Sequence, residues 1–290
     1  SISVGLVLIS IFSIFFFGLN PGIDFKGGAL TEVLYENDRP IHADLVKSLE
    51  DLNLGSILVQ PTGEKGYIIK SRDLNEVEHA LLLKTLSLND TAPFQEVSFN
   101  SIGPSVGREL TRKAIIAIIL VSIGIITFIA FAFRKVSRPI SSWKYGFIAV
   151  ITLLHDVIIP VGLFAMLSHY YGAELDTLFV VAILTILGLS VSDTIVIFDR
   201  IRENLNNQTK LVMSDFNNIV GKSLEQSFVR SIATSLTVIL VLLALFLMGP
   251  VTTKYFSLML VAGMFLGTYS SIFLASPLLV LVGEIQEKKK

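Results

Sequence analysis

The sequence predicts an α-helical polytopic membrane protein, with six transmembrane helices and a small α+β domain between the first and second helices. Apolar residues make up 52% of the 290 residues and charged residues only 16%, against about 25% charged in an ordinary soluble domain. Mean hydropathy is +0.70. The apolar residues gather in six segments, each near the ~20 residues that cross a bilayer core, and most isolated charges lie between the first two segments.

The first apolar segment runs from Ile2 to Leu19 and is followed by Asn20-Pro21-Gly22. It is long for the core of a signal peptide and lacks an A-x-A cleavage site. We therefore interpret residues 1–20 as a membrane anchor whose cytoplasmic flank lies before Ser1.

Residues 21–108 form the predicted soluble domain. Ile41, Leu45, Leu49 and Leu52 share one helical face, and the sequence PTGEKG is typical of a hairpin loop between two short strands. Asp73, followed three residues later by a glutamate, predicts a capping box for a second helix. We expect strands at 28–35, 56–60, 67–70 and 94–101, and helices at 40–52 and about 73–88. This β-α-β-β-α-β order is that of the ferredoxin-like fold.

Residues 109–290 contain the remaining five spans, at about 113–133, 145–167, 176–198, 231–248 and 255–282. The connections 134–144 and 199–230 and the C-terminal tail are rich in lysine and arginine, whereas the loops 168–175 and 249–254 offer only Lys254. Because positive residues mark the cytoplasmic side, we expect cytoplasmic termini and an external soluble domain.

Composition also excludes several classes of function. The sequence has no cysteine, which excludes disulfides, thiolate catalysis and the common structural zinc sites. The net charge is −1 with no basic stripe, so nucleic acid is not an expected partner. No G-x-x-x-x-G-K-[ST] sequence is present, which argues against ATP hydrolysis. We expect no metal site and no cofactor.

The principal candidate for chemistry is Asp193, a carboxylate within the fourth span. An ionised group in hydrocarbon costs roughly 2.5–3.5 kcal/mol or more, so it indicates a function. Arg230 opens the next span, which runs in the opposite direction, at a similar predicted depth. We interpret the two as a proton relay in which Arg230 pairs with the carboxylate or releases it. A permanent structural ion pair, or an Arg230 that extends to the interface, are the alternatives.

Further polar groups accompany these two. His155 and Asp156 lie near the middle of the third span, where a proton relay and a local interhelical hydrogen bond are both open interpretations. Ser192 and Thr194 flank the principal acid, and Thr185, Gly188 and Ser192 make one helix face small enough for a neighbouring helix to approach. Charges at 199–203 are expected to form solvated pairs. The small residues at 263–271 predict helix packing, within the chain or with a partner subunit.

Several separated motifs resemble one family. GIDFKGG (22–28) and IGPSVGREL (102–110) are similar to signatures of the SecD/SecF family, which belongs to the resistance-nodulation-division superfamily. LLHDVIIPVGLFA (153–165), SVSDTIVIFDRIREN (190–204), SFVRSIATSLT (227–237) and GTYSSIFLASPL (267–278) resemble specifically its SecF branch.

The resemblance implies a bacterial inner-membrane subunit that works with SecD, the SecYEG translocon and YajC, and draws unfolded preprotein outward with the proton-motive force. It places Asp193 and Arg230 on the proton path and a further essential acid on SecD. In the first motif, Gly22, Asp24, Gly27 and Gly28 would couple the external domain to the first span. We interpret Gly27 and Gly28 as hinge or close-packing positions, because no helix N-terminus follows them.

Three alternatives stay open at this point. The chain could be half of a small-molecule exporter of the same superfamily, or a scaffold that stabilises the Sec channel without transport. Sodium could replace the proton, since a carboxylate among hydroxyls can coordinate either. An intramembrane protease is disfavoured, because Asp156 and Asp193 are expected at different depths, whereas a catalytic dyad shares one proton at about 3 Å.

Overall fold

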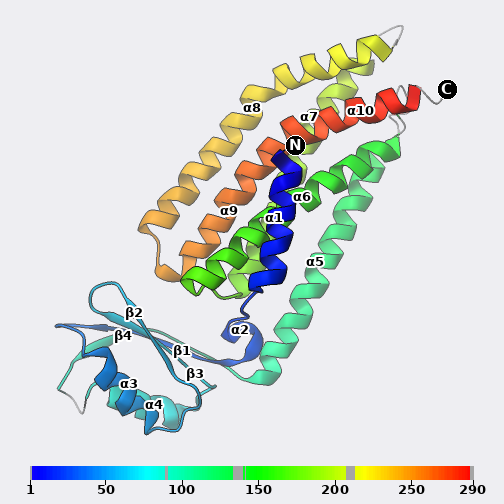
Figure 1. Ribbon diagram of the computed structural model, residues 1–290. Coiled ribbons are helices and arrows are strands. Elements are labelled where there is room, and N and C mark those ends of the chain that lie inside the picture. Colours follow the sequence, from blue (N-terminus) through cyan, green and yellow to red (C-terminus); the bar gives the residue numbers. More distant parts are fainter. Residues whose placement is uncertain (1, 89–90, 133–139, 141, 207–212, 288–290) are drawn as a thin grey trace. The chain divides into compact units, whose positions relative to one another are not determined.

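The computed structural model describes residues 2–88, 91–132, 140, 142–206 and 213–287 (Figure 1). Internal contacts divide the chain into two compact units. We call residues 1–20, 116–173 and 178–290 the helical unit, and residues 21–115 together with Glu174–Thr177 the sheet unit. The sheet unit therefore includes a short piece of chain that lies far from the rest of it in sequence.

The sheet unit has the predicted order of strands and helices. After a one-turn helix, α2 (Ile23–Lys26), the elements are β1 (Gly28–Tyr35), α3 (His42–Glu50), β2 (Leu58–Thr62), β3 (Gly66–Ser71), α4 (Glu76–Leu86) and β4 (Phe94–Ile102). The strands pair antiparallel in the order β2-β3-β1-β4. Figure 1 shows α3 and α4 together on one face of this sheet.

An apolar core fills the space between the sheet and its two helices. Alternate residues of β1 point inward, as the period of a strand requires, and they meet buried leucines from α3 and α4. Tyr35 ends this inward row, and its hydroxyl donates to the carbonyl of Leu86 at 2.9 Å. Burial, and secondarily the nearby Tyr67, raise the pKa of Tyr35 to about 12. The hydroxyl therefore stays protonated and keeps this bond at any ordinary pH.

The predicted capping box of α4 at Asp73 is wrong by two residues. The cap is Asn75, whose side chain accepts from the backbone of Glu78 at 2.9 Å, while the glutamate accepts from the Asn75 backbone at 3.1 Å. Both backbone polar groups of Leu74 bond the hydroxyl of Ser101 on β4. Leu74 is therefore hydrogen-bonded to the sheet, and the helix begins after it.

The helical unit is built from long apolar helices. They are α1 (Ile2–Phe17), the greater part of α5 (Pro104–Ala132), α6 (Ser142–Tyr171), α7 (Thr177–Asn206), α8 (Met213–Met248) and α9 (Val251–Ser270), the last continued by a π-helical turn η1 (Ser271–Ala275) and α10 (Ser276–Glu287). Within the described residues, five helical stretches are long and apolar enough to cross a membrane, and α1 is a shorter apolar helix. Most of the basic connection at 134–144, Lys210 and the three terminal lysines lie outside the described residues.

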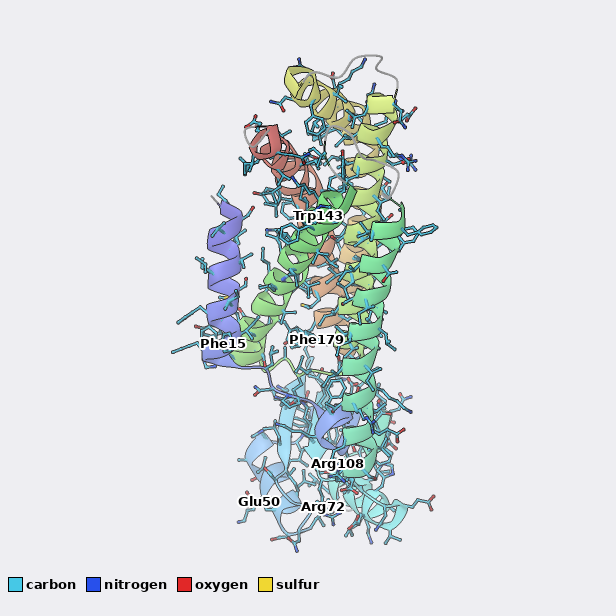
Figure 2. The ribbon with its side chains drawn as sticks, turned by 90° about the vertical axis from the view of Figure 1, so that its right-hand side faces the viewer. Phe15, Glu50, Arg72, Arg108, Trp143 and Phe179 are labelled. Carbon is cyan, nitrogen blue, oxygen red and sulfur yellow. The ribbon has the colours of Figure 1, made fainter. Side chains whose placement is uncertain are left out.

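Helix α1 packs through its small residues rather than its large ones. Its buried residues are Ser3, Ser10 and Ser13, whereas Phe15 is 85% exposed and projects away from the neighbouring helices (Figure 2). A Cβ added to Gly162 of α6 would lie 2.4 Å from the Cβ of Ser10. Small residues let the two backbones approach closely, and the phenyl rings stay outside for lipid.

The interior of the helical unit is made by α6, α7 and α9. In the most apolar stretch of α6, 56% of residues are buried, against 6% in α5 and 11% in α8. Helices α5 and α8 accordingly leave most of their apolar surface uncovered by this chain. That surface is available for lipid or for another subunit.

Two prolines interrupt the helical hydrogen-bond pattern beside buried polar residues. Pro160 lies inside α6, and because it has no N–H, the carbonyl of Asp156 receives no i+4 hydrogen bond. Pro277 follows η1, where the hydroxyl of Ser276 donates instead to the carbonyl of Ser271 at 3.1 Å. Single π-helical turns of this kind are frequent at functional sites.

Candidate functional site

The principal acid lies in the middle of α7. Asp193 is sixteen residues after Thr177 and thirteen before Asn206, so the helix continues well past the end of the predicted span. Its side chain is half-buried.

Hydroxyl groups from two other helices surround this carboxylate. The Oδ2 atom of Asp193 accepts from Thr268 of α9 at 3.2 Å and from Ser235 of α8 at 3.4 Å. The two hydroxyls are also in contact with each other. One oxygen atom therefore joins three helices, and a change in its protonation alters contacts to all three.

The predicted pair between Asp193 and Arg230 is not formed in this structure. No ion pair joins the two residues among those the structure describes, and Arg230 is exposed. Arg230 precedes Ser235 by five residues, which on a helix places it about 7.5 Å further along and roughly 140° around the axis. The inner face of α8 is instead occupied by Ser231 and Ser235, both buried. A permanent structural ion pair is thus inconsistent with this arrangement.

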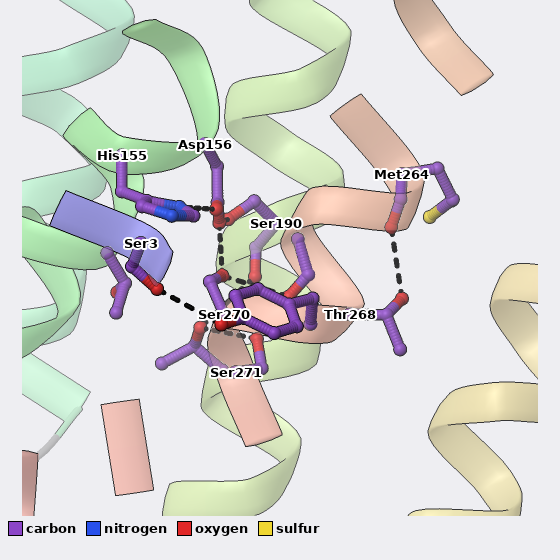
Figure 3. A network of polar contacts seen from close by, with 12 residues as sticks. Ser3, His155, Asp156, Ser190, Met264, Thr268, Ser270 and Ser271 are labelled. Atoms are coloured by element: carbon purple, nitrogen blue, oxygen red, sulfur yellow. Dashed lines mark hydrogen bonds and ion pairs between the residues drawn. The ribbon is translucent and has the colours of Figure 1, made fainter. Parts of the chain in front are cut away.

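His155 and Asp156 form the second polar site, and this one is closed. Asp156 is fully buried. Its carboxyl group lies 2.8 Å from His155 Nδ1 and accepts from Ser190 of α7 at 2.5 Å and from Ser270 of α9 at 2.6 Å (Figure 3). The interhelical hydrogen bond considered from the sequence is therefore present. The two hydroxyls come from two helices, α7 and α9, rather than from one neighbouring span.

The flanking hydroxyls differ in their surroundings. Thr194 of α7 is buried and shares a hydrogen bond of 2.9 Å with Ser271, which follows the end of α9. Ser192 is exposed. Only the first of the two therefore belongs to the interior network.

The two small-residue faces also behave differently. The stripe on α9 packs against α7 of the same chain: a Cβ on Gly263 would lie 2.3 Å from Ile186, and one on Gly267 would lie 3.2 Å from Ser190. On α7, a Cβ on Gly188 would meet nothing within 4 Å, and the neighbouring Ser192 is exposed. The face predicted to receive another helix is therefore uncovered, and it adjoins Asp193.

The GIDFKGG segment makes close backbone contacts within the sheet unit. Gly27 and Gly28 have φ of +84° and +139°, and a Cβ on either would lie 2.8 Å from backbone atoms of Pro104 or Ser71. The motif glycines are thus close-packing positions that no larger residue can fill without a shift. Nothing in their geometry forms a ligand loop.

The same segment forms hydrogen bonds with the connection between α6 and α7. The N–H of Gly22 donates to the carbonyl of Leu175 at 2.7 Å, and a Cβ on the glycine would lie 2.9 Å from that oxygen. The carboxylate of Asp24 accepts from the backbone N–H and the hydroxyl of Thr177 at 2.8 and 2.7 Å. Asp24 therefore caps the first turn of α7, the helix that carries Asp193.

Sequence reasoning missed the hydroxyl partners of both acids. Thr268 and Ser270 were expected only to pack, and Ser190 and Ser235 were not considered singly. A usable signal was present, since each helix facing an acid carries a serine or threonine in an otherwise apolar stretch. A buried carboxyl group requires such donors.

The polar partners of Asp193 among the described residues are hydroxyl groups. Hydroxyls both donate and accept, so they can serve a carboxyl group in either protonation state. No group of three metal-ligating side chains occurs in the part of the chain that the structure describes. Nor does any hydrogen bond join the two carboxyl groups there, as a protease dyad would require.

Apolar helices that enclose two carboxyl groups among hydroxyls define a multi-pass membrane protein of the transport class. The chain belongs to the SecD/SecF family: the model of the protein export membrane protein SecD/SecF C-terminal region matches residues 83–285, and that of the SecD/SecF GG motif matches residues 12–38.

Named relatives and a solved structure agree with this membership. The protein translocase subunit SecF of Thermobaculum terrenum is 44% identical over 277 residues, which cover 91% of this chain and 84% of the relative. The protein translocase subunit SecDF of Bacillus subtilis is 34% identical over 261 residues, 90% of this chain but 34% of that longer one. The crystal structure of the translocon-associated membrane protein SecDF from Thermus thermophilus superposes with a TM-score of 0.78 at 30% identity, covering 96% of this chain and 36% of that one.

Proposed function

We propose that this chain is a subunit of the bacterial protein translocase that works with SecD and uses the proton-motive force to assist preproteins outside the membrane. The observation that carries the proposal is the position of Asp193. It is a half-buried acid in an apolar unit, held by hydroxyls of α8 and α9. A transport component in a family of export proteins can use such a group to bind and release a proton.

Protonation of Asp193 changes the local hydrogen bonds. As a carboxylate, Oδ2 accepts from both Ser235 and Thr268. A protonated carboxyl group has its own hydrogen to donate, and when that hydrogen is on Oδ2 at least one of the two hydroxyls has to accept instead of donate or move away. This event alters the contact of α7 with α8 and α9. A proton crossing ~100 mV supplies about 2.3 kcal/mol, enough to bias such a two-state rearrangement.

Arg230 enters this scheme as the mobile partner. In the present arrangement it is exposed and Asp193 is satisfied by hydroxyls. In the alternative arrangement we expect the guanidinium to approach the ionised carboxylate by rotation of α8. The two arrangements exchange when a proton enters or leaves.

The uncovered face of α7 supports SecD as the partner. Gly188 and Ser192 leave this face open beside Asp193, and small residues allow close approach of another transmembrane helix. Relatives named SecDF are about three times as long as the segment that this chain matches. We propose that the SecD helices cover this face and bring the remaining acid of the proton path. SecYEG, YajC and unfolded preprotein are the other proposed partners.

The membrane arrangement follows from the same proposal. Counting α1 with the five longer helical stretches gives six spans in a bacterial inner membrane. Both termini are then cytoplasmic and the sheet unit, with its ferredoxin-like order, is periplasmic.

The proposal is tested by Asp193→Asn in membranes that contain the whole translocase. We expect preprotein translocation to fall to the level seen without a proton gradient, with SecD still bound. Asp199→Asn is the matched control, because Asp199 lies six residues further along the same helix, exposed and paired with Arg202 at 2.8 Å. Gradient-dependent stimulation that survives in Asp193→Asn would overturn the proposal. Separate proton and sodium gradients in the same assay identify the ion.

A scaffold function is the second candidate. It predicts that Asp193→Asn separates the subunits or leaves gradient-dependent stimulation intact. The absence of an Asp193–Arg230 pair among the described residues argues against this candidate, because a scaffold would use that pair as a permanent link. An exporter half is disfavoured by the small sheet unit, which offers too little volume for a substrate vestibule.

A further inference from the structure

The His155–Asp156 site has a feature that a purely structural hydrogen bond does not need. The imidazole of His155 is 4% exposed, and its Nε2 atom is buried without a hydrogen-bond partner among the described residues. A buried polar atom left unpaired costs about 1–3 kcal/mol. The site therefore keeps an open position for a hydrogen at considerable cost.

The carboxyl group beside it has the hydrogen bonds of an ionised carboxylate. Oδ1 lies 2.8 Å from His155 Nδ1, and Oδ2 lies 2.5 and 2.6 Å from the hydroxyls of Ser190 and Ser270. Both hydroxyls are oriented to donate to the same oxygen, and the imidazole supplies a third hydrogen through Nδ1. Three polar groups thus converge on the two oxygens of one buried carboxyl group.

A negative charge on this carboxyl group needs a compensating positive charge. The basic residues of α7 and α9, which are Arg200, Arg202 and Lys254, are not among its contacts in the described part of the chain. Helix α1 and the turn η1 contain no titratable residue. The titratable residues of α7 and α9 nearest to the site are Asp193 and Tyr269, and Glu284 of α10 bonds Asn217. Among the described residues His155 is the only group in contact with Asp156 that can become a cation. Its second proton would lie on Nε2.

The helical hydrogen bonding of α6 is also interrupted at Asp156. Because Pro160 has no N–H, the carbonyl of Asp156 lacks its helical donor. An extra acceptor is thus present in the same turn as the unpaired imidazole nitrogen. Such interruptions inside membrane proteins lie where the freed polar groups meet water or another polar group.

We propose that His155 and Asp156 form a second proton-binding site of this chain, separate from Asp193, in which one exchangeable proton is held on His155 Nε2. In the protonated state the imidazolium and the carboxylate form a neutral pair. In the deprotonated state Nδ1 keeps its hydrogen, Nε2 carries a lone pair, and the pair has one negative charge.

The site is connected to Asp193 through α7 and α9. Ser190 precedes Asp193 by three residues on α7, and Ser270 follows Thr268 by two on α9, so each helix contacts both acids. Because like charges repel, proton loss at one site favours proton retention at the other. Two coupled sites in one subunit would let the chain hold a proton on its way between membrane faces.

Nitrogen NMR of histidine-labelled full-length protein in lipid vesicles tests the proposal without any export assay. The chain has only four histidines, and loss of one signal in His155→Asn assigns it. We expect Nε2 of His155 to change from protonated to unprotonated between about pH 5 and 9, while Nδ1 stays protonated. Asp156→Asn should weaken proton binding at Nε2 at least tenfold, because the partner carboxylate is lost.

Two further variants keep the result interpretable. Asp193→Asn should leave His155 titrating, at a lower pH, because a nearby negative charge is removed. His169→Asn is the matched control, an exposed histidine on the same helix, and should leave the titration of His155 unchanged. A His155 signal that is constant over this pH range overturns the proposal even if Asp156→Asn does not fold. A titration that vanishes in Asp193→Asn also overturns it, because a single shared site would then explain both.

Discussion

The two units of this protein differ in how many polar side chains they bury and how many large apolar ones they expose. The sheet unit encloses an apolar core, with Leu45, Leu49, Leu82 and Leu86 fully buried. Among its described residues, the helical unit buries sixteen serines and threonines together with Asp156, half-buries Asp193, and exposes many leucines, isoleucines and phenylalanines. The difference shows which solvent each unit meets, since water drives apolar groups inward and lipid does not.

The same comparison separates the forces that stabilise each unit. Burial of apolar area contributes about 25 cal/mol per Å² where the alternative is water. In lipid that term is absent between helices, so close packing of small residues and interhelical hydrogen bonds must supply the stability. Substitutions that create space should therefore harm the sheet unit most, and substitutions that fill space should harm the helical unit most.

The largest effect is expected from Gly162→Val. The new Cβ would lie 2.4 Å from the Cβ of Ser10, a separation that forces α1 away from α6. We expect loss of most monodisperse protein after detergent extraction, measured by size-exclusion chromatography. Gly124→Val on α5 is the control, because nothing lies within 4 Å of a Cβ there. Equal yields from the two variants would contradict the claim that close packing of small residues stabilises the helical unit.

An intermediate effect is expected from Leu82→Ala in the sheet unit. The leucine is fully buried, so its truncation should cost about 2–5 kcal/mol. Faster hydrogen exchange in β1 and β3, followed by mass spectrometry, measures the loss. Leu81→Ala, at a neighbouring position that is 46% exposed, should change exchange little. If both substitutions act alike, the core described for this unit does not stabilise it.

The smallest effect is expected at the surface of the sheet unit. The hydrogen bonds from Arg72, and secondarily from the Asn75 backbone, lower the pKa of Glu78 from 4.5 to about 2. Because the folded pKa lies below the unfolded one, Glu78 stabilises the unit above about pH 4.5, and this contribution is lost as pH falls toward 2. Glu78→Gln should flatten the acid dependence of hydrogen exchange in α4 over that range. An unchanged profile would assign the acid sensitivity to other groups.

Periodicity and turn chemistry predicted the sheet unit well. Gly28–Tyr35 begins and ends as expected, and the hairpin at PTGEKG is present with Gly63 at φ +55°. The misplaced cap at Asp73 shows the limit, because Asp73 and Asn75 both satisfy the local pattern. Only the long-range bonds between Leu74 and Ser101 decide between them.

For the candidate site, the sequence identified the acids but not their surroundings. A charge in an apolar run is visible without any structure, so Asp156 and Asp193 could be found directly. Which residue of α8 faces Asp193 depends on the rotation and position of that helix, and a rotation of roughly 140° with a shift of about 7.5 Å separates Arg230 from Ser235. The partner set of a buried acid is therefore a property of tertiary packing, which helical spacing alone does not determine.

The short segment Glu174–Thr177 limits how this molecule can be divided. Lys70 pairs with Glu174 at 2.8 Å, and Asp24 holds Thr177, so the sheet unit uses a piece of chain from between α6 and α7. An excised fragment of residues 21–115 would lack that piece and leave its partners exposed. Domain exchange between relatives should therefore transfer both segments together.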